Sequence, residues 1–273
     1  MYFQPTTLDQ AVQDAQTEGL RILAGGTDFF PMNGDRLPEG PILDVTRIKG
    51  MTGITRTPEG WRIGGATCWS DILKAELPLA FDGLKAAARE VGSIQIQNAG
   101  TIAGNLCNAS PAADSVPPLL TLGAKVELTS ASGRRLLHLE DFILGVRKTT
   151  LQAGEILTAV HIADAGQARS AFSKLGSRKY LVISIAMVAV LIEIQDGAIA
   201  RARVAVGACS PVAQRLPELE AELQGCRQVA GLVTPDHLSV LSPIDDVRGS
   251  AEYRLEVVAP MIEEAIERCL EST

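Results

Sequence analysis

Short apolar segments separated by turn residues run through most of this chain and predict many brief strands. Some alternate apolar and polar positions and others are apolar throughout, as half-buried and fully buried strands do. The expected strands are "RILA" at 21–24, "PILDV" at 41–45, "WRIGGAT" at 61–67, "AKVELTS" at 124–130, "RRLLHL" at 134–139, "EILTAVHI" at 155–162, 170–174, 183–194 and "IARARVAVGA" at 199–208.

Segments with apolar residues on one side predict helices between these strands. Thr7 is expected to cap the first helix, with Gln10 completing a capping box and Gly19 ending the helix. A long C-terminal helix should bend near Pro260. Helices are expected at 70–77, 81–91, 216–225 and 250–270.

The uneven order of helices and strands indicates an α+β fold, because a doubly wound sheet needs their regular alternation. Hairpin turns are expected at "SASG", 130–133, and at Asp196-Gly197. The 273 residues exceed a common domain size of about 100–150, and the polar stretch "ADAGQARS" at 163–170 is typical of a boundary. We therefore predict domains at 1–165 and 170–273.

Composition and charge exclude several classes of function. The chain is 46% apolar and 21% charged, with a net charge of −7, which argues against binding to nucleic acid or to an anionic membrane surface. Apolar runs such as 183–192 are shorter than the ~20 residues of a membrane span. The N-terminal residues have no basic start followed by an apolar core, so we expect no secretory signal and a cytoplasmic protein.

The cysteine and histidine residues form no recognisable ligand pattern. The five cysteines and three histidines are widely spaced, without a C-x-x-C pair or an H-E-x-x-H motif, so we expect reduced thiols and no metal site in this chain. No side-chain acid, base or nucleophile is proposed as catalytic.

Two polar, glycine-containing segments stand out as candidate binding loops: "LAGGTDFFP" at 23–31 and "AGTIAGNLCNASPAADS" at 99–115. Neither contains Lys or Arg. An anionic ligand would have to be bound by backbone N–H groups and uncharged side chains, and small residues allow the chain to curl around such a ligand. Gly25 and Gly26 are expected to do this in the first segment, and Gly100 and Gly104 in the second. The alternative is that both segments are tight turns packed under a core.

Neither segment matches the G-x-G-x-x-G fingerprint or the Walker motif, which disfavours Rossmann-type nucleotide binding and P-loop phosphoryl transfer. The segments "LAGGTDFFP", "TIAGNLCNASPAADSVPPLLTLGAKVEL" and "SPIDDVRGSAEYRLEV" instead resemble the flavin-binding medium subunit of the molybdenum hydroxylases, the family of xanthine and carbon monoxide dehydrogenases. The likeness covers nearly the whole chain.

The resemblance implies a PCMH (vanillyl-alcohol-oxidase) type domain, made of two α+β subdomains with FAD between them, and a small C-terminal domain of the carbon monoxide dehydrogenase flavoprotein type. It implies that 24–28 and 101–105 surround the FAD diphosphate, that Ser110 and Asp114 contact the ribityl or adenosine end, and that Leu157 and Lys174 lie near the flavin ring. The implied cofactor-binding residues are Leu23, Ala24, Gly25, Gly26, Thr27, Asp28, Thr101, Ile102, Ala103, Gly104, Asn105, Ser110, Asp114, Leu157 and Lys174.

This sequence departs from the family pattern in a few places. Ala103 stands where a glycine is frequent, and Cys107 and Asn108 replace small or β-branched residues. The cysteine-rich insertion of the 4-hydroxybenzoyl-CoA reductase branch is absent, which disfavours an extra iron–sulfur centre.

Several other residues have two interpretations. Tyr180 and the basic 177–179 stretch either frame the flavin or form a solvated loop. Arg248 and Arg254 either pair with acidic neighbours and fix the last helix, or face a partner. Trp61 and Trp69 are expected to pack rather than stack on flavin.

The resemblance implies an electron-transfer subunit. Substrate would be hydroxylated at molybdopterin on a large partner subunit, and electrons would pass through two-iron two-sulfur clusters on a small subunit to this FAD, then to NAD+, a quinone or oxygen. A dimer of heterotrimers is the implied assembly. Two alternatives remain: a stand-alone flavoprotein oxidoreductase with its own substrate pocket, and a binding module that keeps the fold without flavin.

Overall fold

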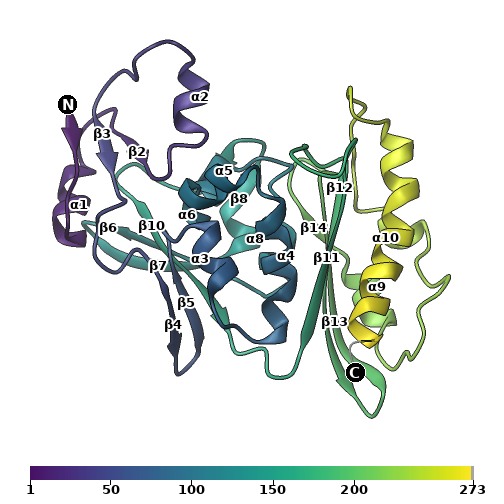
Figure 1. Ribbon diagram of the computed structural model, residues 1–273. Helices are drawn as coiled ribbons and strands as arrows, with labels where there is room; N and C mark the ends of the chain where they lie inside the picture. The colour runs from purple at the N-terminus through teal and green to yellow at the C-terminus, as the bar shows by residue number, and fades with distance from the viewer. Residues whose placement is uncertain (272–273) are drawn as a thin grey trace. The chain divides into compact units, whose positions relative to one another are not determined.

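The computed structural model describes residues 1–271 and divides them into two compact units (Figure 1). Unit 1 consists of Met1–Ala75, Ser93–Ala109 and Ala124–Asp164. Unit 2 consists of Glu76–Gly92, Ser110–Gly123 and the chain from Ala165 onward. The fold is a mixture of helices and strands, as predicted, although unit 2 draws two segments from the first half of the chain.

Unit 1 begins with a small parallel sheet in the order β1-β3-β2, formed by β1 (Tyr2–Phe3), β3 (Ile42–Asp44) and β2 (Arg21–Leu23). Helix α1 (Leu8–Asp14) packs on one face through Ala11 and Val12, which share a core with Leu43. Helix α2 (Phe29–Asn33) follows β2 after a short loop. Paired residues of neighbouring strands point to the same face, so this sheet has one face toward α1 and an opposite face that carries Arg21 and Leu23.

A five-stranded antiparallel sheet forms the rest of unit 1, in the order β4-β5-β10-β6-β7. A β-bulge interrupts the pairing of β10 with β6 between Leu157 and Ala159. The strands are β4 (Ile54–Thr57), β5 (Gly60–Gly64), β6 (Lys125–Ser130), β7 (Gly133–His138) and β10 (Ile156–Ala163), beside the hairpin β8 (Ile143–Gly145) and β9 (Lys148–Thr149). The helices are α3 (Trp69–Lys74), α5 (Ile94–Ala99), α6 (Ile102–Asn108) and α8 (Leu139–Phe142).

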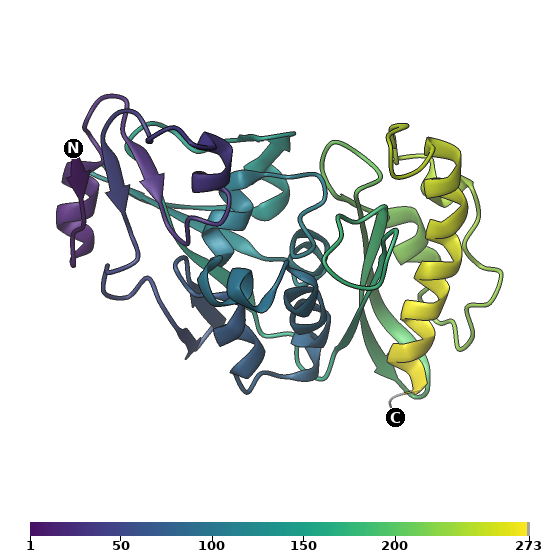
Figure 2. The same cartoon turned by 45° about the horizontal axis from the view of Figure 1, so that its top comes forward.

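Unit 2 is built on a four-stranded antiparallel sheet with helices on both faces (Figures 1 and 2). Its strands follow the order β11 (Arg169–Leu175), β12 (Ala186–Gln195), β13 (Ala198–Gly207) and β14 (Gln214–Arg215). One face packs against α9 (Pro217–Glu222) and α10 (Ala251–Glu271), and the other against α4 (Asp82–Glu90) and α7 (Val116–Thr121). Because both faces are covered, β12 is almost continuously apolar. Short 3₁₀ turns lie at Leu79–Phe81 and Asp236–Leu238.

Most predicted elements are present, and the Asp196-Gly197 turn is confirmed with positive φ at both residues, 53° and 72°, as a type I′ hairpin requires. The first capping box is wrong. Thr7 does accept a hydrogen bond from the Gln10 N–H, but the Gln10 side chain donates to Asp14. The helix ends at Asp14, not at Gly19.

The prediction of a continuous polar loop over 99–115 is also wrong, because α6 occupies its first half. Thr101 caps this helix, and Ala109 ends it in the left-handed conformation at φ 45°. Four further helices of the described residues, α2, α5, α7 and α8, have no counterpart in the predicted elements.

Arg254 has the structural role at the start of α10. Arg254 is 2% exposed, and its guanidinium donates to the carbonyls of Ile185 and Ala208 and to Asp246. Arg248 pairs with the same Asp246. These contacts tie the start of α10 to the sheet of unit 2.

None of the helices within 1–271 has both the length and the apolar character that a bilayer-spanning helix needs.

Candidate functional site

The loop that links β2 to α2 exposes a row of unused backbone donors. Among the described residues, none of the N–H groups of 25–28 donates to a protein acceptor. Gly26 has a φ of +74°, a left-handed conformation that turns the chain sharply and leaves the successive N–H groups of this loop without protein acceptors. Such a backbone arrangement binds anions. We refer to residues 25–28 as the N–H cradle.

The second predicted segment packs directly against this cradle. A Cβ on Gly25 would lie 1.8 Å from the carbonyl oxygen of Ala99, and one on Gly104 would lie 3.9 Å from the Cβ of Ala24. One on Gly100 would approach the Thr27 hydroxyl to 3.4 Å. The structure therefore brings the two polar segments together in unit 1, and Gly25 is required by close backbone approach.

The donors at the start of α6 are, in contrast, already used within the protein. The N–H of Ile102 donates to Thr67 O at 3.1 Å and that of Ala103 to Gly65 O at 3.0 Å. The Gly104 N–H donates to Thr101 Oγ1 at 3.1 Å. The second segment thus does not free its glycine N–H groups as expected, and it offers a ligand mainly side chains.

Leu157 lies beside this second segment, at the bulge of β10. It is 3% exposed, and a Cβ on Gly65 would lie 2.5 Å from its carbonyl oxygen and 3.1 Å from the Ala103 Cβ. The carbonyl oxygen of the next residue, Thr158, accepts a hydrogen bond from the Gly65 N–H, with an N–O distance of 2.8 Å. The bulge, Gly65 and the start of α6 therefore form one packed wall.

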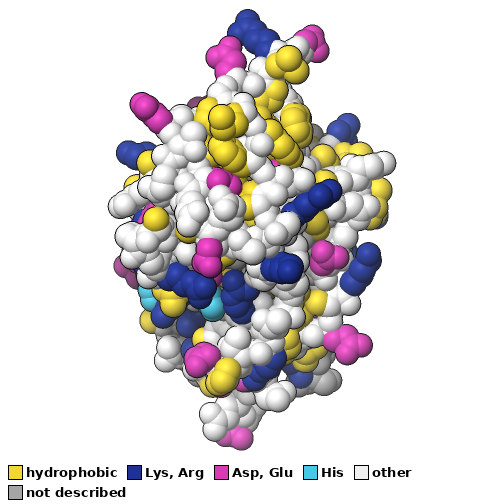
Figure 3. Space-filling view, turned by 90° about the vertical axis from the view of Figure 1, so that its left-hand side faces the viewer, with side chains coloured by type: hydrophobic (Ala, Val, Ile, Leu, Met, Phe, Trp, Pro, Cys, Tyr) yellow, Lys and Arg dark blue, Asp and Glu magenta, His cyan; other side chains and the backbone are white. Residues whose placement is uncertain are grey.

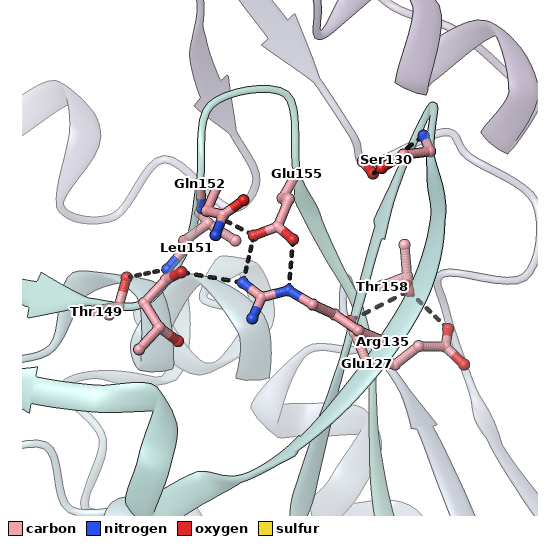
Figure 4. Close-up of polar contacts among 10 residues, drawn as sticks. Glu127, Ser130, Arg135, Thr149, Leu151, Gln152, Glu155 and Thr158 are labelled. Carbon is pink, nitrogen blue, oxygen red and sulfur yellow. Dashed lines mark hydrogen bonds and ion pairs between the residues drawn. The ribbon is translucent and has the colours of Figure 1, made fainter.

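Buried polar side chains hold the bulge in place (Figure 4). The Thr158 hydroxyl donates to Glu127 Oε1 at 2.6 Å, and Glu127 Oε2 lies 3.1 Å from His161 Nε2. Burial acts to raise the pKa of Glu127, but the hydrogen bonds from Thr158 and His161 and the nearby Arg62 outweigh it, and the pKa is lowered. Glu127 is therefore an anion at neutral pH and a firm acceptor for Thr158.

A bidentate ion pair fixes the turn that enters β10 (Figure 4). Arg135 donates through Nε and Nη2 to the two oxygens of Glu155, at 2.6 and 2.7 Å. Glu155 also accepts the N–H of Gln152 at 2.8 Å. The hydrogen bond from Arg135 lowers the pKa of Glu155, although burial opposes it.

Three of the predicted residues lie in unit 2. Asp114 is 7% exposed and forms a buried ion pair with Lys174, at 2.7 Å from Oδ2 to Nζ. Ser184 donates to its other oxygen at 2.6 Å. Burial raises the pKa of Asp114, and the Lys174 ammonium opposes that rise. Ser110 accepts the N–H of Ala112 at 3.3 Å, which forms a local turn.

Two surface features accompany these sites. Tyr180 is 64% exposed, with the Lys179 ammonium 5.3 Å from its ring centre, so the 177–180 stretch is a solvated loop in this structure. Phe30 and Met32 of α2 are 53% and 72% exposed. Figure 3 shows one face of the molecule, with hydrophobic side chains gathered in its upper part and charged side chains of both signs above and below them.

Comparison with known proteins identifies the family to which this architecture belongs. Residues 1–164 match the family model described as the FAD binding domain in molybdopterin dehydrogenase, and 170–269 match the CO dehydrogenase flavoprotein C-terminal domain. The chain belongs to the FAD-binding medium subunits of molybdenum hydroxylases. It is thus a flavin-binding oxidoreductase subunit.

Similar medium subunits align over nearly their whole length. The chain is 30% identical to the nicotine 6-hydroxylase medium subunit of Paenarthrobacter nicotinovorans, covering 97% of this chain and 95% of that one. It is 31% identical to the glyceraldehyde dehydrogenase medium chain of Sulfolobus acidocaldarius, covering 94% and 93%. A chain of reconstituted CO dehydrogenase from Oligotropha carboxidovorans superposes with a TM-score of 0.90 at 26% identity, covering 100% and 98%.

The residues of this medium subunit suit the diphosphate of FAD. The cradle supplies unpaired N–H donors, the Thr27 hydroxyl lies beside them, and no acidic side chain except the exposed Asp28 lies within it. Over residues 1–271 no three His, Cys, Asp or Glu side chains are grouped as a metal site would need.

Sequence reasoning missed the side chains that support the site. Glu127 lies on β6, Arg135 on β7 and Thr158 on β10, and Glu155 directly precedes β10. Only the sheet register brings these residues together. An acidic residue flanked by apolar neighbours in "KVELTS" was the one available signal, because a glutamate rarely becomes buried unless it is paired.

Proposed function

We propose that this subunit carries electrons between iron–sulfur clusters and an external acceptor, using FAD bound in unit 1 at residues 23–28, 101–105 and Leu157. FAD supplies the electron-transfer chemistry when it is bound. The chain's own residues bind and orient it: the cradle takes the diphosphate, and the bulge of β10 supplies a rigid wall.

The observation that carries this proposal is the row of unused N–H groups at 25–28 in a loop without Lys or Arg. Unpaired backbone donors are uncommon in folded proteins. An anionic ligand would explain four successive unused donors, and in this family the flavin cofactor brings a diphosphate.

The substrate would be hydroxylated elsewhere. We propose a large partner subunit with molybdopterin and a small partner subunit with two-iron two-sulfur clusters, assembled as a dimer of heterotrimers in the cytoplasm. NAD+, a quinone or oxygen would take the electrons. The support is that similar chains are medium chains of dehydrogenases and hydroxylases.

We further propose that residues 1–165 and 170–273 are the two domains, and that Ser110, Asp114 and Lys174 belong to the FAD-binding residues. Asp114 and Lys174 form a buried ion pair, which is a polar group with little net charge.

The test is to purify the chain from its native source under mild conditions and to assay the chain alone and in its complex. We expect two further polypeptides that contain molybdenum and iron to co-purify, and an isolated chain that is yellow but turns over no organic substrate. Turnover of a small organic substrate by the isolated chain would refute the proposal in favour of a stand-alone oxidoreductase.

A further inference from the structure

Arg21, on β2, has a buried guanidinium edge that contacts no acceptor. Its Nε and Nη2 atoms are buried and have no hydrogen-bond partner within the described residues. These two nitrogens lie on the same edge of the guanidinium, where their N–H groups are parallel. Arg135 uses that edge to bind both oxygens of Glu155, and Arg215 uses it to bind Glu220. Arg21 therefore presents an anion-binding edge with no anion.

The register of the parallel sheet places this edge on the side of the cradle. Arg21 and Leu23 point to the face opposite the α1 core, because Ile22 between them packs into that core. Leu23 lies within 3.6 Å of a Cβ on Gly26, and the Phe29 ring covers the Arg21 Cζ at 4.8 Å. The guanidinium thus lies beneath the point where the cradle turns into α2.

Asp44, the acidic residue of β3, is not available to Arg21. Asp44 points to the same face, since it pairs with Leu23. Its carboxylate already accepts hydrogen bonds from Tyr2, from Gln4 at 2.7 Å and from Thr46 at 2.6 Å. A cation held away from water without a counter-charge destabilises the folded chain.

We propose that Arg21 binds the diphosphate of FAD through its Nε and Nη2 edge, and so supplies the positive charge that the cradle lacks. This inference rests on FAD binding by this chain. A guanidinium forms two parallel hydrogen bonds to phosphate oxygens, whereas a lysine ammonium provides charge without that geometry. The ring of Phe29 lies over the guanidinium, with the Arg21 Cζ 4.8 Å from the ring centre, and this cation–π contact helps to orient the side chain.

The proposal predicts two effects of opposite sign for Arg21→Met. The dissociation constant for FAD should rise roughly 10- to 100-fold, because a charge-assisted bidentate contact is lost. The flavin-free chain should melt at a higher temperature, because an unpaired buried cation is removed. A purely structural arginine would instead lower the melting temperature when it is replaced.

The experiment uses the full chain, stripped of flavin, as wild type and as Arg21→Met, Arg21→Lys and Arg56→Met. Arg56 is the matched control: its guanidinium also lies over an aromatic ring of unit 1, at 5.1 Å from the Trp61 centre, but it is paired with Asp164. FAD affinity is measured from flavin fluorescence at two salt concentrations, and melting from circular dichroism.

Support consists of weaker FAD binding in Arg21→Met, a smaller loss in Arg21→Lys, a raised melting temperature of flavin-free Arg21→Met, and unchanged FAD binding in Arg56→Met. The salt dependence of FAD binding should also decrease in Arg21→Met, since one charge contact is gone. The inference about Arg21, but not the proposed function, would be overturned by either of two results. One is equal FAD affinity in Arg21→Met and wild type, and the other is an Arg21→Met chain that is less stable or fails to fold. A wild-type chain that takes up no FAD would overturn both this inference and the proposed function.

Discussion

Substitution of Gly25 by alanine tests whether the two polar segments pack as closely as the structure shows. Gly25 does not have a positive φ, so alanine adds no backbone strain there. Its Cβ would, however, lie 1.8 Å from the Ala99 oxygen, 2.5 Å from the Ala99 carbonyl carbon and 3.0 Å from the Gly100 Cα. All three are backbone atoms, so no side-chain rotation relieves the clash. The cradle and the end of α5 would have to move apart.

The expected magnitude follows from that geometry. Overpacking a core costs about 1–3 kcal/mol, and a clash of backbone against backbone belongs at the upper end, about 3 kcal/mol. For a chain of this size, this corresponds to a fall of roughly 6–12 °C in melting temperature. FAD affinity should fall in the same variant, because the cradle is displaced from the second segment.

The assay is thermal unfolding of the full chain with and without FAD, together with a FAD titration. Gly145→Ala is the matched control, because it lies in the same unit without a positive φ, and its added Cβ would meet nothing within 4 Å. We expect the control to stay within about 0.5 kcal/mol of the wild type. If Gly25→Ala melts within about 2 °C of Gly145→Ala and binds FAD equally well, the packing of the two segments described above is wrong.

Two further predictions concern buried charges. The pKa of Glu127 is lowered in the folded chain, so its carboxylate contributes stability above its unfolded pKa, near 4.5. This contribution is lost as the pH falls through the lower folded pKa. Melting curves should therefore show a steeper loss of stability below about pH 4.5 in the wild type than in Glu127→Gln. Asp114→Asn leaves Lys174 buried without its counter-charge, and urea unfolding should show a loss of about 3–5 kcal/mol. Glu193→Gln breaks the ion pair with Arg201, whose side chains are 45–46% exposed, and should cost less than about 1 kcal/mol. If Asp114→Asn and Glu193→Gln lower the free energy of unfolding equally, the ion pair of Asp114 with Lys174 is not buried as described.

The N–H cradle could be predicted from the sequence because its determinants are local. Adjacent glycines after a short apolar strand, without nearby Lys or Arg, indicate a loop that can approach an anion. Helix α6 could not be predicted in the same way. Gly104, Asn105 and Asn108 are weak helix formers, and the first turn is held by carbonyls of the distant Gly65 and Thr67.

The buried charged side chains could not be predicted from the sequence either, because their partners are distant in the chain. Asp114 and Lys174 are separated by 60 positions, and Glu127 and Thr158 by 31. Their pairing depends on strand order and register, which short patterns do not determine. Arg21 gave no signal either, because a single arginine in a strand indicates nothing until its missing partner is seen.

The most direct test of the central claim is the absorption spectrum of the purified full chain after incubation with FAD and removal of the excess. Denaturation and chromatography then identify what was bound. The account predicts a flavin spectrum, release of about one FAD per chain, and no iron. A colourless chain that retains no FAD under these conditions would contradict it and would leave the 23–31 and 99–115 segments with a structural role only.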